Sequence, residues 1–258
     1  MIATIEVPSS GAWFEGHFPG RPILPGVAEL ALAVDALARV AGRPVSLRGI
    51  AFARLRQLVF PGDRLDLAAR ELDATRLRID LKRGDDLVAN GELILGTPEV
   101  SRDAAPAYVV STTPASAFPV IDELLPHRAP MRFLETILRE TADGLICIAR
   151  IPRACALVAG GSASPVAAIE AAAQAAAAWE ALRRWRDAGV AAPRIGYLVA
   201  LRDVVFFMAK VPAERDLQVS VSLEAAAAPL THYRIEVSME GRLVACGTIA
   251  TFLTEQAA

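Results

Sequence analysis

A loop rich in glycine and proline places a titratable imidazole just before an apolar stretch. Residues 17–26 read His-Phe-Pro-Gly-Arg-Pro-Ile-Leu-Pro-Gly, and the apolar residues 27–40 follow as a predicted helix. The prolines fix φ and remove backbone donors, while the glycines allow close backbone approach. The helix start leaves unpaired N–H groups with partial positive charge. His17 as a base, beside an oxyanion-binding N–H of Gly26 or Val27, is the combination that proton abstraction next to a carbonyl requires.

The elements that must position this loop form a simple first half. A strand at 2–7 leads into the loop and then into a helix at about 26–41, which Gly42 and Pro44 end. Four strands are predicted after the helix, at 46–59, 65–70, 77–81 and 87–95, with turns at 61–63 and 83–85.

The second half repeats this plan. An opening segment at 118–135 leads through a strand near 145–151 to a Gly/Ser loop at 160–164. A helix follows from about Pro165, which suits the first helical position, to Arg186, and Gly189 suits its stop. Strands are predicted at 195–208, 217–223, 232–239 and 243–252.

Both predicted helices are apolar around most of their circumference, so each must be wrapped by a sheet rather than laid on one. The fold class is therefore α+β, a double hot-dog in which each half is a long central helix wrapped by an antiparallel sheet. The proline-rich stretch 97–119 is the candidate linker. We predict a first domain at 1–100, a linker at 101–116 and a second domain at 117–258.

Composition limits the function classes. The 258 residues are 53% hydrophobic, with a net charge of −2 that favours neither nucleic acid nor an anionic membrane surface. No apolar run is long enough to span a bilayer, and the N-terminus reads as a strand rather than a signal peptide. Three scattered cysteines indicate reduced thiols and a cytoplasmic protein. With three histidines and no His/Cys cluster, no metal is expected.

Two motifs resemble the β-hydroxyacyl-acyl-carrier-protein dehydratases of fatty acid synthesis, the FabA/FabZ type. One is the loop from His17 to Gly26, with Phe60-Pro61-Gly62-Asp63 downstream, and the other is Leu124 to Met131, which is similar to the family's opening motif. An ordinary member carries both motifs in one domain, whereas here they lie in different halves. The chain therefore looks like two fused hot-dog domains, an active-like half followed by one similar to the partner dehydratase of aryl polyene pathways.

The resemblance implies an active site shared between the halves. Family members are dimers in which the loop His meets an acid on the partner's central helix, fourteen residues after that partner's own loop His. Fourteen residues after His17 stands Ala31, which is no acid, whereas the second half keeps Glu170 and, four residues later, Gln174. The loop before Glu170 has no His. We therefore expect one composite site per chain, with His17 as base and Glu170 as acid.

The expected reaction is dehydration of a 3-hydroxyacyl thioester to a trans-2-enoyl product, in fatty acid or polyene and polyketide synthesis. No cofactor is expected, since the substrate rides on the phosphopantetheine of an acyl carrier protein. A ketosynthase or another synthase component is a further possible partner, as is another copy of the chain. The predicted substrate-binding residues share a place beside the loop or the acid: Phe18, Gly20, Gly26, Val27 and Gln174.

Alternative interpretations remain open at this point. Hot-dog domains also host acyl thioesterases, and a non-catalytic scaffold that binds a carrier protein fits the loss of one acid and one His equally well. Glu29 is a rival acid, although it points about 200° around the helix from Ala31. His127 is interpreted as a structural residue near the start of the second half. The arginines at 183, 184 and 186 are interpreted as a solvated helix end.

Overall fold

The computed structural model describes residues 1–98, 117–189 and 194–257. The predicted linker at 101–116 lies outside the described residues. The first half contains β1 (Ile2–Glu6), α1 (Gly26–Ala41), β2 (Leu47–Leu55), β3 (Arg64–Glu71), β4 (Arg76–Arg83) and β5 (Asp86–Leu95). These elements agree closely with the predicted ones. Gly42 ends α1 in the left-handed conformation, with φ of 63°.

The second half starts with α2 (Ile121–Leu124), β6 (Leu134–Thr141) and β7 (Gly144–Ala149), followed by the short strands β8 (Val158–Ala159) and β9 (Ser162–Ala163). The remaining elements are α3 (Ala167–Ala188), β10 (Arg194–Phe206), β11 (Val211–Pro212), β12 (Leu217–Ala227), β13 (Leu230–Met239) and β14 (Arg242–Ala257). Two differences from the prediction stand out. β6 had been missed, and α3 begins two residues after Pro165, with Val166 as its N-cap.

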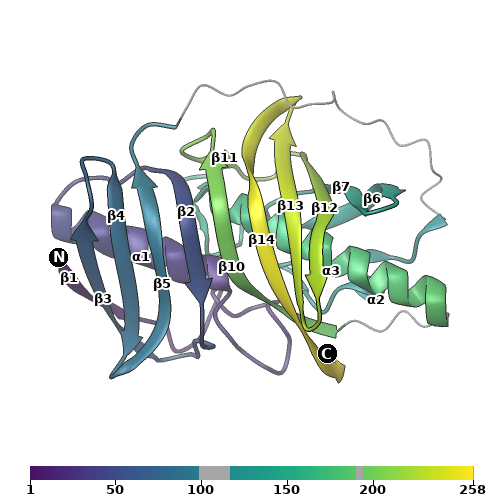
Figure 1. Ribbon diagram of the computed structural model, residues 1–258, viewed down its shortest axis with the longest axis horizontal. Helices are drawn as coiled ribbons and strands as arrows, with labels where there is room; N and C mark the ends of the chain where they lie inside the picture. Colours follow the sequence, from purple (N-terminus) through teal and green to yellow (C-terminus); the bar gives the residue numbers. More distant parts are fainter. Residues whose placement is uncertain (99–116, 190–193, 258) are drawn as a thin grey trace.

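A single antiparallel sheet of eleven strands runs through both halves, in the order β1-β3-β4-β5-β2-β10-β14-β13-β12-β7-β6. The halves join edge to edge where β2 pairs with β10, for example at Ala53 and Leu201. In Figure 1, α1 and α3 both lie on the same side of this sheet, each across its own half. The sequence predicted the two wrapped helices but not that their sheets would be continuous.

The buried side chains of the two halves form one continuous hydrophobic core. Strands of the first half contribute alternate residues, as in β4, where Leu77, Ile79 and Leu81 face inward and their neighbours face outward. In α3, small residues dominate the buried surface, and Ala171, Ala172 and the other alanines near them let the sheet approach the helix closely. The core therefore fixes the position of α3 relative to the first half. No helix of the described residues combines the length and hydropathy needed to span a membrane.

Candidate active site

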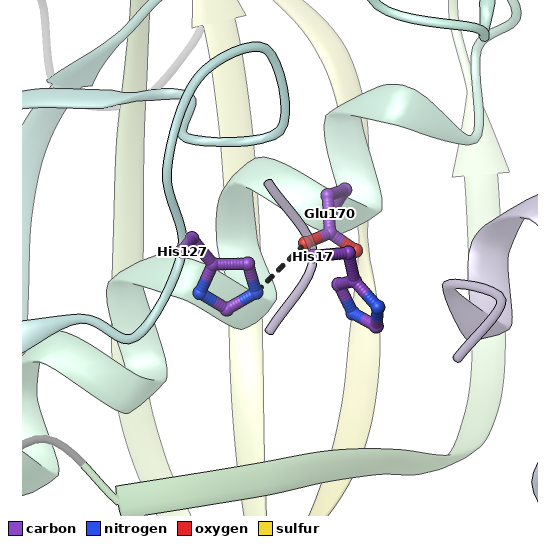
Figure 2. A group of neighbouring side chains, drawn as sticks. All are labelled: His17, His127 and Glu170. Carbon is purple, nitrogen blue, oxygen red and sulfur yellow. Dashed lines mark ion pairs between the residues drawn. The ribbon is translucent and has the colours of Figure 1, made fainter. Parts of the chain in front are cut away.

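His17 and Glu170 come from different halves, and the fold brings them together. His17 lies in the loop before α1, and Glu170 lies in the first turn of α3. Nitrogen atoms of His17 and of His127 and a carboxylate oxygen of Glu170 all lie within 4.8 Å of one another. All three residues are buried, with exposed fractions of 6%, 6% and 4%. Figure 2 shows both rings next to the Glu170 carboxylate. The predicted meeting of a loop His with the helix acid of the other half is thus present in the geometry.

The tautomer of His17 follows from one hydrogen bond. Its Nδ1 lies 3.0 Å from the backbone carbonyl oxygen of Ile23. A carbonyl can only accept, so Nδ1 carries the proton and Nε2 keeps its lone pair. Burial lowers the pKa of His17 to about 4, and the bond to Ile23 opposes this only in part. The ring is therefore neutral at pH 7, with Nε2 available as a base.

The Glu170 carboxyl group is tuned in the opposite direction. Burial raises the pKa of Glu170 to about 7, and a hydrogen bond from Gln174 opposes the rise. The Gln174 Nε2 donates to Glu170 Oε1 over 2.9 Å. A carboxyl group that stays protonated near neutral pH can donate a proton, so the site contains a neutral base beside a neutral acid.

A cavity of about 680 Å³ opens onto these groups. His17, His127 and Glu170 line it, and it continues along one face of α3 past Ala173, Ala177 and Glu180 to Arg184. At a rise of 1.5 Å per residue, the distance along α3 from Glu170 to Arg184 is about 21 Å. The cavity can therefore take a long, mostly apolar ligand with one end at the His–Glu pair.

Comparison with known proteins agrees with this architecture. Residues 119–258, more than half of the chain, match the ApeP-like family, described as ApeP dehydratase, and residues 1–92 match the ApeI-like family, described as ApeI dehydratase. The chain belongs to the FabZ-type dehydratases, as a tandem. The 3-hydroxyacyl-[acyl-carrier-protein] dehydratase FabZ of Legionella pneumophila strain Lens is 34% identical over 120 residues, which cover 40% of this chain and 77% of that protein. FabZ of Chloroflexus aggregans is 34% identical over 110 residues, 37% of this chain and 74% of that one.

Solved structures similar to the tandem dehydratase agree on the fold. The dehydratase domain of PpsC from Mycobacterium tuberculosis superposes with a TM-score of 0.71 at 14% identity, covering 98% of this chain and 93% of that one. The dehydratase domain of RzxB from Pseudomonas fluorescens gives a TM-score of 0.67 at 17% identity, with 96% and 93% covered. Both likenesses support the double hot-dog fold alone.

The predicted substrate-binding residues are only partly at the cavity. Phe18, Gly26 and Gln174 line it. Gly20 is exposed and does not line it, and Val27 is fully buried behind the cavity wall. The N–H groups of Gly26 and Val27 have no backbone acceptor among the described residues, as expected of a helix start. Of these two residues, only Gly26 lines the cavity, as an oxyanion donor must.

Sequence reasoning placed Glu29 and Arg184 wrongly, and it did not foresee that His127 lies beside the acid. His127, interpreted as structural, has its Nε2 3.5 Å from Glu170 Oε1. Glu29, expected to point away from the buried stripe that contains Ala31, is itself buried, because the first turns of α1 are buried all round. It is 3% exposed, lines the cavity, and burial raises its pKa. Arg184 is half-buried on the cavity wall, whereas Arg186 pairs with Glu140 at the surface. The signal for His127 was its place in the opening motif, which in a fused pair of domains can face the other half.

His17, His127 and Glu170 are also the only group among the described residues that could ligate a metal ion. The donor types, two imidazoles and a carboxylate, suit zinc. Their atoms are spread over as much as 4.8 Å, whereas the ligands of a tetrahedral zinc ion lie about 3.3 Å apart. The arrangement is therefore looser than a zinc site and fits a space between a base and an acid.

Replacing Gln174 with leucine is expected to destabilise the protein by about 3 kcal/mol or more. Its side-chain amide is fully buried, and it forms hydrogen bonds both with the backbone around Met131 and with the acid itself. Oε1 accepts from the N–H groups of Phe133 and Leu134, and Nε2 donates to Met131 and to Glu170. Leucine would leave these groups unpaired in the core. Urea unfolding measures the loss, and a change below 1 kcal/mol would mean that water replaces the amide.

Proposed function

We propose that this chain dehydrates 3-hydroxyacyl thioesters at a single composite site formed by its two halves. The observation that carries the proposal is the placement of His17 and Glu170, from different halves, within 4.8 Å on one cavity wall. Membership of the FabZ-type dehydratases supports the reaction class. Ala31 on α1, and a loop at 160–164 without a His, argue that the equivalent second site, with the roles of the halves exchanged, is inactive.

In the proposed reaction, His17 Nε2 takes the Cα proton of the substrate. Negative charge then develops on the thioester oxygen, and in this proposal the N–H of Gly26, which lines the cavity at the start of α1, stabilises it. Glu170 protonates the C3 hydroxyl, which leaves as water, and the Cα–Cβ double bond forms. His17 gains one proton and Glu170 loses one, so the total number of protons on the two residues does not change. No metal or organic cofactor is needed for these steps, which use only a base, an acid and an oxyanion donor.

The proposed substrate is carried by an acyl carrier protein. The cavity is about 21 Å long along α3, apolar at Ala173 and Ala177, and bordered by arginines at its far end. Arg183, Arg184 and Arg194 line that end beside one acid, Glu180, so cationic side chains outnumber anionic ones there. An acidic carrier protein, or the phosphate of its pantetheine arm, is the partner that this charge would attract.

The test is turnover of a 3-hydroxyacyl-carrier-protein by the purified chain, with the enoyl product and free thiol both measured. We expect enoyl product without thiol release, and loss of most activity in Glu170→Gln. Asp35→Asn is the matched control, because Asp35 is an exposed carboxylate on α1. Thiol release would indicate a thioesterase, and carrier binding without turnover would indicate a scaffold.

The pH dependence of the reaction is expected to be bell-shaped. His17 must be neutral to act as base, so kcat/KM is lost as the pH falls through about 4. Glu170 must be protonated to act as acid, so kcat/KM is lost as the pH rises through about 7. A profile measured from pH 4 to 9 should therefore peak between these values. Activity that rises steadily to pH 9 would contradict the assignment of Glu170 as the acid.

A further inference from the structure

His127 is held rigidly beside the acid by contacts from both halves. Its ring centroid lies 5.0 Å from that of Phe18 and 5.4 Å from that of His17. The neighbouring N–H of Arg128 donates to the carbonyl of Gly16 over 2.8 Å, so the two segments are joined backbone to backbone. The Arg128 guanidinium donates to the carbonyls of Leu125 and of His127 itself. The imidazole is therefore fixed in place before any substrate arrives.

The two oxygens of the Glu170 carboxyl group are not equivalent. Met131, Phe133 and Leu134 fix which end of the Gln174 amide is the donor, and that donor points at Glu170 Oε1. The Nε2 of His127 also faces Oε1, at 3.5 Å, as the dashed line in Figure 2 marks. An oxygen that accepts from an amide is the carbonyl-type oxygen of a protonated carboxyl group. The acidic proton of Glu170 consequently belongs on Oε2.

We propose that His127 is a positioning residue for the acid, whose Nε2–H donates to Glu170 Oε1 while Oε2 delivers the proton to the leaving hydroxyl. The contact is long in the free protein and shortens as the carboxylate forms, because a donor binds an ionised oxygen more strongly than a neutral one. The interaction thus strengthens as the reaction proceeds. This inference rests on the proposed function.

The Nε2–H tautomer also accounts for the other ring nitrogen. His127 Nδ1 is buried and has no partner among the described residues. An N–H there would be a buried donor without an acceptor, and it would also leave the Nε2 lone pair facing the Oε1 lone pairs, whereas the Nε2–H tautomer leaves only the Nδ1 lone pair unpaired. Burial lowers the pKa of His127 well below its usual value, and electrostatic interactions with His17 and Arg128 lower it further. His127 is therefore a neutral donor.

Other groups also influence the titration of Glu170, and their effects must be distinguished from the effect of His127. His17 faces it from the loop before α1, and Gln174 donates to it from its own helix. Cys155, from the segment between β7 and β8, is close enough to interact with it electrostatically, and Glu29 lines the same cavity from α1. None of these changes identity in a His127 variant, so a change in Glu170 titration there reports His127.

The experiment titrates the Glu170 carboxyl in the full chain by carbon-13 NMR of glutamate labelled at Cδ, with Glu170→Gln to assign its signal. His127→Leu is expected to raise the proton affinity of Glu170 about tenfold, because the carboxylate loses a donor. His127→Gln, whose amide reaches the same position, is expected to return most of that change. Circular dichroism and urea unfolding establish that both variants are folded.

The outcomes are distinct. An unchanged titration in His127→Leu would make His127 a packing residue, and a lower proton affinity would mean that Nε2 accepts a proton from Glu170 instead. Either result overturns the inference. The titration does not depend on turnover, so it stands even if the wild-type chain forms no enoyl product and the proposed function fails. If the chain is active, the alkaline limb of the pH profile should move with the titration in His127→Leu.

Discussion

Replacing His17 with alanine is expected to lower kcat/KM for a 3-hydroxyacyl thioester by about 10³-fold, and Glu170→Gln by about 10²-fold or more. The double variant is expected to be only a few-fold slower than the slower single variant. The reason is that the base and the acid act together in the same dehydration step. Once the base is absent, little is left for the acid to accelerate.

The prediction can be tested cleanly because the two residues lie in different halves of the chain. His17 precedes α1 and Glu170 lies in α3, so each variant leaves the other half's residue in place. The rate of enoyl formation by the two single variants, the double variant and the Asp35→Asn control completes a double-mutant cycle. If the two losses multiply in full, the residues act in separate steps and the composite site as proposed is wrong.

Local chemistry in the sequence was enough to predict most of the elements. The turn at Arg83–Asp85 joins β4 to β5 as expected, and Gly84 there has φ of 61°. Gly42 ends α1 for the same reason, since a left-handed residue is needed and glycine adopts it without strain. These signals lie within a few residues of the feature that they determine.

Long-range pairing could not be predicted in the same way. Nothing near β2 indicates that it pairs with β10, about 150 residues later in the chain. Gly49 is the residue that allows it, because a Cβ there would lie 2.5 Å from the carbonyl oxygen of Val204. A glycine inside a strand suggests a close approach but does not name the partner.

The site shows the same division. The pairing of His17 with Glu170 was predictable because the resemblance assigned complementary losses to the two halves. Glu29 was misplaced because a helical-wheel argument assumes one solvent face, and the start of α1 has none. The closeness of His127 to Glu170 was not foreseen because it depends on how the opening segment meets the His17 loop, which no local pattern records.

Replacing Gly16 with alanine is expected to destabilise the protein by about 3 kcal/mol or more and to remove most of its activity. Gly16 has φ of 77°, and a Cβ there would lie 2.0 Å from the carbonyl oxygen of Arg128 and 2.8 Å from that of Ala129. Both are backbone atoms, so no side chain can rotate away. The segment of His127 would have to move from the segment of His17.

The matched control is Gly84→Ala. Gly84 also has a positive φ, but a Cβ there meets nothing within 4 Å, and the residue lies in the β4–β5 turn, away from the cavity lining. The Gly84→Ala variant should be destabilised by only about 1 kcal/mol, the cost of the left-handed conformation, and should keep its activity. Urea unfolding and enoyl formation, measured on both variants, separate strain from the loss of the contact between the halves. If Gly16→Ala behaves like Gly84→Ala, the chain relaxes around the new methyl group at little cost. The backbone contact between Gly16 and Arg128 is then not what holds the segments of His17 and His127 together.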